Sequence, residues 1–259
     1  MSASDSIDVL PPAVLPPAAT PTDADAHAGP ASGVRPGFRA VIEPGLHAVR
    51  RNWRGMLLIQ ALAAAAVAAY YFVPATGRFF AMLAELNQRF GVFYALVAAV
   101  FAGAVLPEVA KAVTRPDWRL RGRAEELAFN VCFFAYVGPM VYVFYGALER
   151  FAGAGNDVGT IATKVAIDML LFTPFWALPA GLALFDWRLA GYRWRPVVAS
   201  LGPRWYRDRV VPVMVPNLVF WLPMVCLIYA LPGPLQLVLW TLAMAAWSLV
   251  LVFLSNRET

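Results

Sequence analysis

Six long apolar stretches constrain the fold of this chain more than any other feature. They lie at residues 55–74, 91–113, 128–148, 161–185, 210–232 and 234–254. A helix of roughly 20 apolar residues crosses a bilayer core about 30 Å thick, and each stretch is near that length. Helices are expected because lipid cannot satisfy free backbone hydrogen-bonding groups. The sequence therefore predicts an all-α, polytopic transmembrane helical bundle with six spans, or five if one stretch does not cross.

The composition argues against a water-soluble enzyme. Apolar residues make up 60% of the chain and charged residues 14%, which lies outside the usual soluble range. The only histidines, His27 and His47, precede the first apolar stretch, while Cys132 and Cys226 fall inside apolar stretches. Intramembrane haem, zinc or Ser-His chemistry therefore has no imidazole available. We predict no catalytic residues, no cofactor and no metal site.

The chain divides into three regions by composition. Residues 1–36 are rich in Pro, Ala, Ser and Asp and have too little apolar bulk to pack a core. We predict a disordered cytoplasmic tail there, a basic juxtamembrane segment at 37–54 and a transmembrane domain at 55–255. The tail carries acids before any Arg, which is the wrong charge pattern for a secretory signal.

The distribution of cations predicts the orientation. With a cytoplasmic N-terminus and six spans, 17 of the 21 Lys and Arg residues fall on the inner side. Both termini are therefore expected in the cytoplasm. The excess of Arg (19) over Lys (2) suits a GC-rich bacterial genome, so a bacterial inner membrane is the expected location. The net charge of +5 is scattered over short segments, which does not favour nucleic-acid binding.

Two inner loops alternate cations with aromatic residues, in RPDWRLRGR and DWRLAGYRWRPVVASLGPRWYRDR. Trp118, Trp187, Trp194 and Trp205 fit amphipathic segments that lie in the headgroup layer. Membrane lipid is therefore the first expected partner. A homo-oligomer through small-residue faces such as 61–69 stays open.

Polar residues inside the spans are the candidate functional positions. Asp168 lies one helical turn after Lys164, so the two are expected to pair and lower each other's cost in the membrane. The pair fits a structural role, a pore lining or, least, catalysis. Glu108 and Lys111 form a similar, more peripheral constellation, and Asn130 and Asn217 suit hydrogen bonds between helices. Prolines inside the spans are compatible with kinked helices that line a cavity and equally with helices that are only bent.

Three stretches resemble the Mpv-17 and peroxisomal membrane protein (22 kDa) family over about residues 91–255. YVGPMVYVFYGALERF matches at Gly138, Pro139, Tyr145 and Arg150, among others. KVAIDMLLFTP matches at Lys164, Asp168 and Pro174, and VVPVMVPNLVFWLP keeps the spacing of Pro212 and Pro223. Met169 and Val215 stand where the family has Gln. The resemblance implies a small integral membrane protein without a cofactor that acts as a weakly selective channel for small solutes.

Two function classes remain at this point. A channel for a small polar solute is favoured because Asp168, Lys164 and several proline-containing spans could converge on one cavity. The alternative is a non-conducting structural or adaptor protein held by its basic aromatic loops. An intramembrane enzyme is third, because carboxylates without His or a placed nucleophile make a weak catalytic set.

Overall fold

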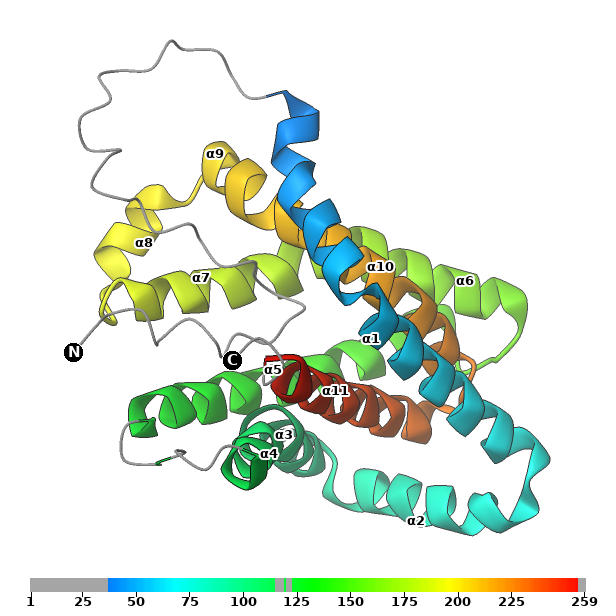
Figure 1. Ribbon diagram of the computed structural model, residues 1–259. Helices are drawn as coiled ribbons and strands as arrows, with labels where there is room; N and C mark the ends of the chain where they lie inside the picture. The colour runs from blue at the N-terminus through cyan, green and yellow to red at the C-terminus, as the bar shows by residue number, and fades with distance from the viewer. Residues whose placement is uncertain (1–36, 115–118, 120–122, 256–259) are drawn as a thin grey trace, which may run out of the picture.

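The chain is all-α throughout the part that the structure describes, which confirms the predicted fold class. This computed structural model describes residues 37–114, 119 and 123–255, and these ranges contain helices and no strand (Figure 1). The predicted tail at 1–36 and Trp118 lie outside the described residues. The elements in chain order are α1 Phe38–Phe72, α2 Pro74–Phe90, α3 Val92–Val100, η2 Phe101–Val105, α4 Leu106–Thr114, α5 Ala124–Ala152, α6 Val158–Ile167, η4 Asp168–Ala177, α7 Leu178–Leu189, α8 Trp194–Ser200, α9 Pro203–Trp205, η5 Tyr206–Val210, α10 Val211–Tyr229 and α11 Gly233–Ser255, where η marks π-helix.

Five continuous helical runs are long and apolar enough to cross a membrane. They are Phe38–Phe72, Val92–Thr114, Ala124–Ala152, Val158–Leu189 and Pro203–Tyr229. The sixth predicted stretch forms α11, Gly233–Ser255, which is not among these five runs. The chain is thus a multi-pass helical bundle, with α11 as the helix that separates five spans from six.

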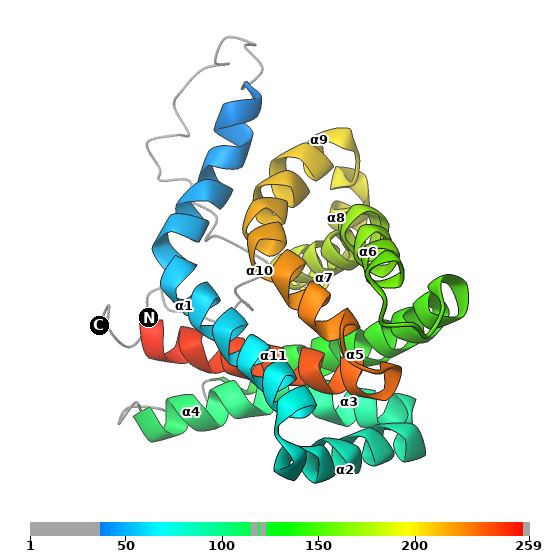
Figure 2. The same cartoon turned by 90° about the vertical axis from the view of Figure 1, so that its right-hand side faces the viewer.

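The first span is longer than its apolar stretch, because the basic residues at 37–54 form the first turns of α1. α1 runs beside α10, and the two backbones meet closely at Gly45 (Figures 1 and 2). A Cβ on Gly45 would lie 2.2 Å from the carbonyl oxygen of Pro212. The juxtamembrane residues therefore pack against the start of α10.

Pro74 ends the first span. Val73 has an extended backbone, which is the conformation that a following proline favours, and Pro74 opens α2 at a position where no N–H is needed. α2 then packs along α11, below it in Figures 1 and 2. The sequence pattern did not predict this helix. α2 ends at Gly91, whose φ of +51° suits glycine and turns the chain into α3.

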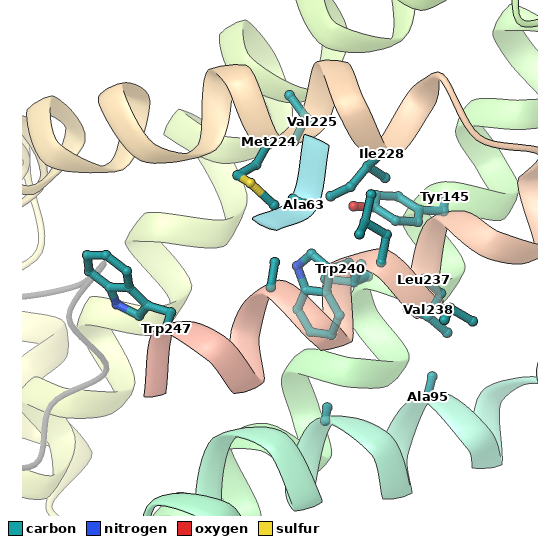
Figure 3. Close-up of a cluster of buried hydrophobic side chains, with 14 of the residues drawn as sticks. Ala63, Ala95, Tyr145, Met224, Val225, Ile228, Leu237, Val238, Trp240 and Trp247 are labelled. Atoms are coloured by element: carbon teal, nitrogen blue, oxygen red, sulfur yellow. The ribbon is translucent and has the colours of Figure 1, made fainter. Parts of the chain in front are cut away.

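α11 lies at the centre of the bundle and contacts α1, α2, α3, α4, α5 and α10. Figure 3 shows how side chains from these helices meet, with Trp240 and Leu237 of α11 facing Tyr145, Met224 and Ile228. α3 and α5 approach more closely still. Ala95 and Ala99 are fully buried, and a Cβ on Gly138 would lie 2.3 Å from the Ala95 carbonyl oxygen.

Large apolar side chains cover the outside of the spans. Those that are more than half exposed include Leu57, Leu62, Phe93, Phe101, Leu170, Leu171, Phe175 and Trp176. In water such a surface would be costly, whereas in a bilayer it faces hydrocarbon. The apolar exterior is therefore the expected contact surface for membrane lipid.

Connections that alternate along the chain lie at opposite ends of the bundle. The turns between α1 and α2, α5 and α6, and α10 and α11 lie toward the right of Figure 1, whereas α8 lies toward the left. Asp157 caps α6 at the first of these ends by accepting a hydrogen bond from the Thr160 amide at 3.0 Å. Hydrogen bonds from Thr160 also hold the pKa of Asp157 below its ordinary value. The Arg-rich connection around α8 is at the other end.

We expect Asn156→Cys to be labelled only from outside the cell and Ala199→Cys only from the cytoplasm. Both positions are exposed at opposite ends of the helices, and the basic connection is expected inside. The measurement is labelling of intact cells and of inside-out membrane vesicles with a membrane-impermeant maleimide, with Cys132 and Cys226 first replaced by Ala. Labelling of Asn156→Cys from the cytoplasmic side alone would reverse the orientation.

Candidate functional site

Asp168 opens the π-helix η4 and forms the polar centre of the bundle. Its carboxylate accepts a hydrogen bond from the Tyr229 hydroxyl at 2.5 Å and another from the Thr173 hydroxyl at 3.1 Å. All three side chains are buried. η4 and the end of α10 thus meet at a carboxylate with two hydroxyl donors.

The π-helix explains why Thr173 reaches Asp168. Pro174 cannot donate a backbone N–H, and its ring would clash with the Leu170 carbonyl in a regular α-helix. The chain instead widens to π-helix over Asp168–Ala177. Residues five apart lie one turn apart in that geometry, and Thr173 is five residues after Asp168. The proline therefore shapes the site.

The predicted ion pair between Lys164 and Asp168 is wrong. The Lys164 ammonium is buried, and it has no hydrogen-bond partner in the described part of the chain. Helical side chains point back toward the N-terminus, so Lys164 extends away from a residue that follows it, and Lys before acid is the weaker order for such a pair. The ammonium interacts electrostatically with Glu149 of α5 instead.

A central cavity of about 150 Å³ lies beside Asp168. Its polar lining includes Asp168, Thr173, Asn217 and Ser248, and its walls are aromatic, with Phe133, Tyr145, Phe172, Trp221, Trp240 and Trp247. The Asn217 Oδ1 and Trp247 Nε1 atoms are buried and have no hydrogen-bond partner among the described residues. One unsatisfied acceptor and one unsatisfied donor therefore face a space large enough for a small molecule.

A second, outer cavity of about 420 Å³ lies near the ends of α2 and α5 and the start of α11. Its lining includes Asn87, Gln88, Glu149, Arg150 and Gln236. Tyr145 lines both cavities, and its ring meets the Tyr229 ring edge-on with centroids 5.5 Å apart. Figure 3 shows Tyr145 between α10 and α11. Tyr145 is thus the residue that the linings of both described cavities have in common.

No family model, no curated protein and no solved structure matches this chain.

The positions on which the sequence resemblance rests are spread over the bundle. Gly138 sits at the close contact of α5 with α3, Pro174 is in η4, and Pro212 meets Gly45. Tyr145 lines both cavities, and Arg150 lines the outer one. Pro139 and Pro223 lie within α-helical stretches.

The remaining predicted polar residues divide between the site and the scaffold. Asn217 joins Asp168 at the central cavity, whereas Asn130 is buried with an Oδ1 that no described residue hydrogen-bonds. Glu108 pairs with Lys111 at 2.8 Å as expected, and also with Arg123 at 3.2 Å. Glu126 completes a group of four charges, of which Glu108 and Lys111 are buried and Arg123 and Glu126 partly buried, and which we call the inner ion cluster. Neither described cavity is lined by Glu108.

Sequence reasoning missed Tyr229, Thr173, Asn87 and Trp247. Thr173 precedes Pro174 and follows Asp168 by five residues. The proline was therefore the sequence feature that could have indicated a widened helix, in which Thr173 reaches Asp168. Tyr229 and Trp247 lie far from Asp168 in sequence and carry no pattern that places them beside it. Within the described ranges, no three His, Cys, Asp or Glu side chains converge as a metal site requires.

The loop tryptophans form contacts in the connection around α8. Trp187 stacks on Trp194 with centroids 5.2 Å apart, and Trp205 Nε1 donates to Asp186 at 2.7 Å. Trp187 and Trp205 belong to the ends of the helical runs, so the separate interfacial helix is the short α8. Arg188 pairs with Glu125 at 2.9 Å, and Tyr192 also donates to Glu125. Burial and Glu125 together raise the pKa of Tyr192.

Proposed function

We propose that this chain is a channel for small polar solutes in a bacterial inner membrane, with both termini in the cytoplasm. The path leads from the outer cavity, past Tyr145, into the central cavity beside Asp168. The observation that carries the proposal is that Tyr145 lines both cavities, each of which also has polar side chains in its lining.

The energetics of burial support this reading. A carboxylate inside a membrane helix costs several kcal/mol, so such a residue usually serves a pathway or a site. Asp168 has two hydroxyl donors and no cationic partner among the described residues. Its charge therefore remains available to act on a passing solute at short range. The likeness to the Mpv-17 family, proposed from its motif positions, favours the same class.

A non-conducting adaptor is the second candidate, and the inner surface supports it. Trp194 is 47% exposed and lies between Arg193 and Arg195. Cations interleaved with aromatic residues suit an anionic lipid surface or an acidic partner. Conduction by the purified protein separates the two candidates.

We expect Asp168→Asn to leave the protein folded and to lower its preference for cations over anions by about tenfold or more, because a unit charge at close range contributes at least 1.4 kcal/mol at an effective dielectric of about 20. The amide oxygen of Asn can still accept from one of the two hydroxyls, and its NH2 group can donate to the oxygen of the other, so the fold is retained. The measurement is the reversal potential in planar bilayers under a salt gradient.

Glu85→Gln is the control, because Glu85 is exposed on α2 and lines neither described cavity. It should conduct as the unmodified protein does. Equal reversal potentials for Asp168→Asn and the unmodified protein would remove Asp168 from the path. Silent bilayers with folded, unmodified protein would favour the adaptor.

A further inference from the structure

The outer cavity has charges of both signs on one wall. Glu149 and Arg150 are consecutive residues near the end of α5, and both line the cavity. Consecutive helical side chains point in different directions, so they face different parts of the space. Among the described residues, no hydrogen bond or ion pair engages either side chain. A carboxylate and a guanidinium are therefore both available to a ligand.

Gly233 gives the Glu149 carboxylate its place. A Cβ on Gly233 would lie 2.8 Å from each of the two carboxylate oxygens of Glu149. Real side chains do not approach that closely, so any larger residue would push the carboxylate away. Because Gly233, the first residue of α11, has no side chain, the Glu149 carboxylate has room at the cavity wall.

Asn87 supplies an acceptor to the same cavity. Its amide nitrogen donates to the Pro234 carbonyl at 2.8 Å, which fixes the side chain against α11. Its Oδ1 is buried and has no hydrogen-bond partner in the described part of the chain. Asn87 is only 6% exposed, so this acceptor loses free energy unless a ligand donates to it.

The balance of charge decides which ligand fits. Lys164 interacts electrostatically with Glu149 but is absent from the cavity lining. Two cations, Lys164 and Arg150, therefore accompany one carboxylate. A simple amine would meet net positive charge, and a simple anion would leave Asn87 and Glu149 without a donor.

We propose that the outer cavity binds a small zwitterion that carries a primary ammonium and a carboxylate, the chemistry of an α-amino acid. The ammonium donates to the Glu149 carboxylate and to Asn87 Oδ1, and the carboxylate accepts from the Arg150 guanidinium. The volume of about 420 Å³ is within the range of small-molecule sites. The claim that this zwitterion is the solute of a channel rests on the proposed function. The claim that the cavity binds it requires no conduction.

The test is calorimetric titration of the full chain in nanodiscs with glycine, ethylamine and acetate at one pH. Glycine should bind at least about tenfold more tightly than either singly charged probe, because only glycine uses both charges. Equal affinity for ethylamine would show a plain cation site, and equal affinity for acetate a plain anion site. Either result overturns the proposal.

Two variants connect binding to the named residues. Gly233→Ala should weaken glycine binding by about tenfold or more by displacing the Glu149 carboxylate. Gly77→Ala is its matched control, since a Cβ there meets nothing within 4 Å and Gly77 is outside the cavity. Glu149→Gln keeps the shape of the side chain, so it tests the charge without the steric change. It should lose the preference for glycine over acetate, and unchanged glycine affinity in Glu149→Gln overturns the site.

Conduction measured on the same preparation separates this proposal from the proposed function. Protein that binds glycine without conducting would retain the site and refute the channel. Protein that conducts without binding any of the three probes would retain the channel and refute the site.

Discussion

Gly138→Ala is expected to destabilise the folded protein, whereas Gly146→Ala on the same helix stabilises it slightly. A Cβ at position 138 would lie 2.3 Å from the Ala95 carbonyl oxygen and 2.7 Å from the Ala99 Cβ. α3 and α5 would have to separate, and such overpacking costs about 1–3 kcal/mol or more. At position 146 a Cβ meets nothing within 4 Å, so only the helix propensity changes, by up to about 1 kcal/mol in favour of Ala.

The measurement is the thermal midpoint of both variants in one detergent. The opposite signs matter more than the sizes, because the two substitutions are chemically identical and share α5. Equal midpoints for both variants would show that α3 and α5 do not approach as closely as described.

Prolines made part of the helical architecture predictable. In an α-helix the proline ring clashes with the carbonyl four residues earlier. For Pro107, Pro174 and Pro212 those carbonyls belong to Gly103, Leu170 and Asp208, which lie in η2, η4 and η5. Pro139, Pro216 and Pro223 stay in α-helical stretches, so proline alone does not decide where a span widens.

The spans were predictable because a helix in lipid has to satisfy its backbone hydrogen bonds within itself. Each span therefore appears in the sequence as one long apolar stretch. The site was less so. The sequence spacing predicted that Asp168 lies next to Lys164. Spacing gives no information about the direction of a side chain, or about which distant helices pack beside it in the fold. Tyr229 took the position that Lys164 was expected to hold, since α10 brings its hydroxyl to within 2.5 Å of the carboxylate. Asn87 escaped notice because α2 was not expected as a helix.

Lys111→Met should lower the free energy of unfolding by about 3–5 kcal/mol, because Arg123 is then the one cation of the four-residue cluster that Glu108 and Glu126 share. In the inner ion cluster, Lys111 pairs with Glu108 at 2.8 Å and lies 3.9 Å from Glu126, while Arg123 lies 3.0 Å from Glu126. Folded yield and thermal midpoint in detergent provide the measurement.

The double change Glu108→Leu with Lys111→Met should recover much of that loss, because it removes one charge of each sign and leaves Arg123 paired with Glu126. Arg207→Met is the matched control. Arg207 pairs with Asp208 at 2.6 Å, but their side chains are 39% and 50% exposed, so breaking this pair should cost no more than about 1 kcal/mol. If the double variant is as unstable as Lys111→Met, packing rather than charge balance accounts for the cluster. If Arg207→Met is equally harmful, burial is not what distinguishes the two pairs.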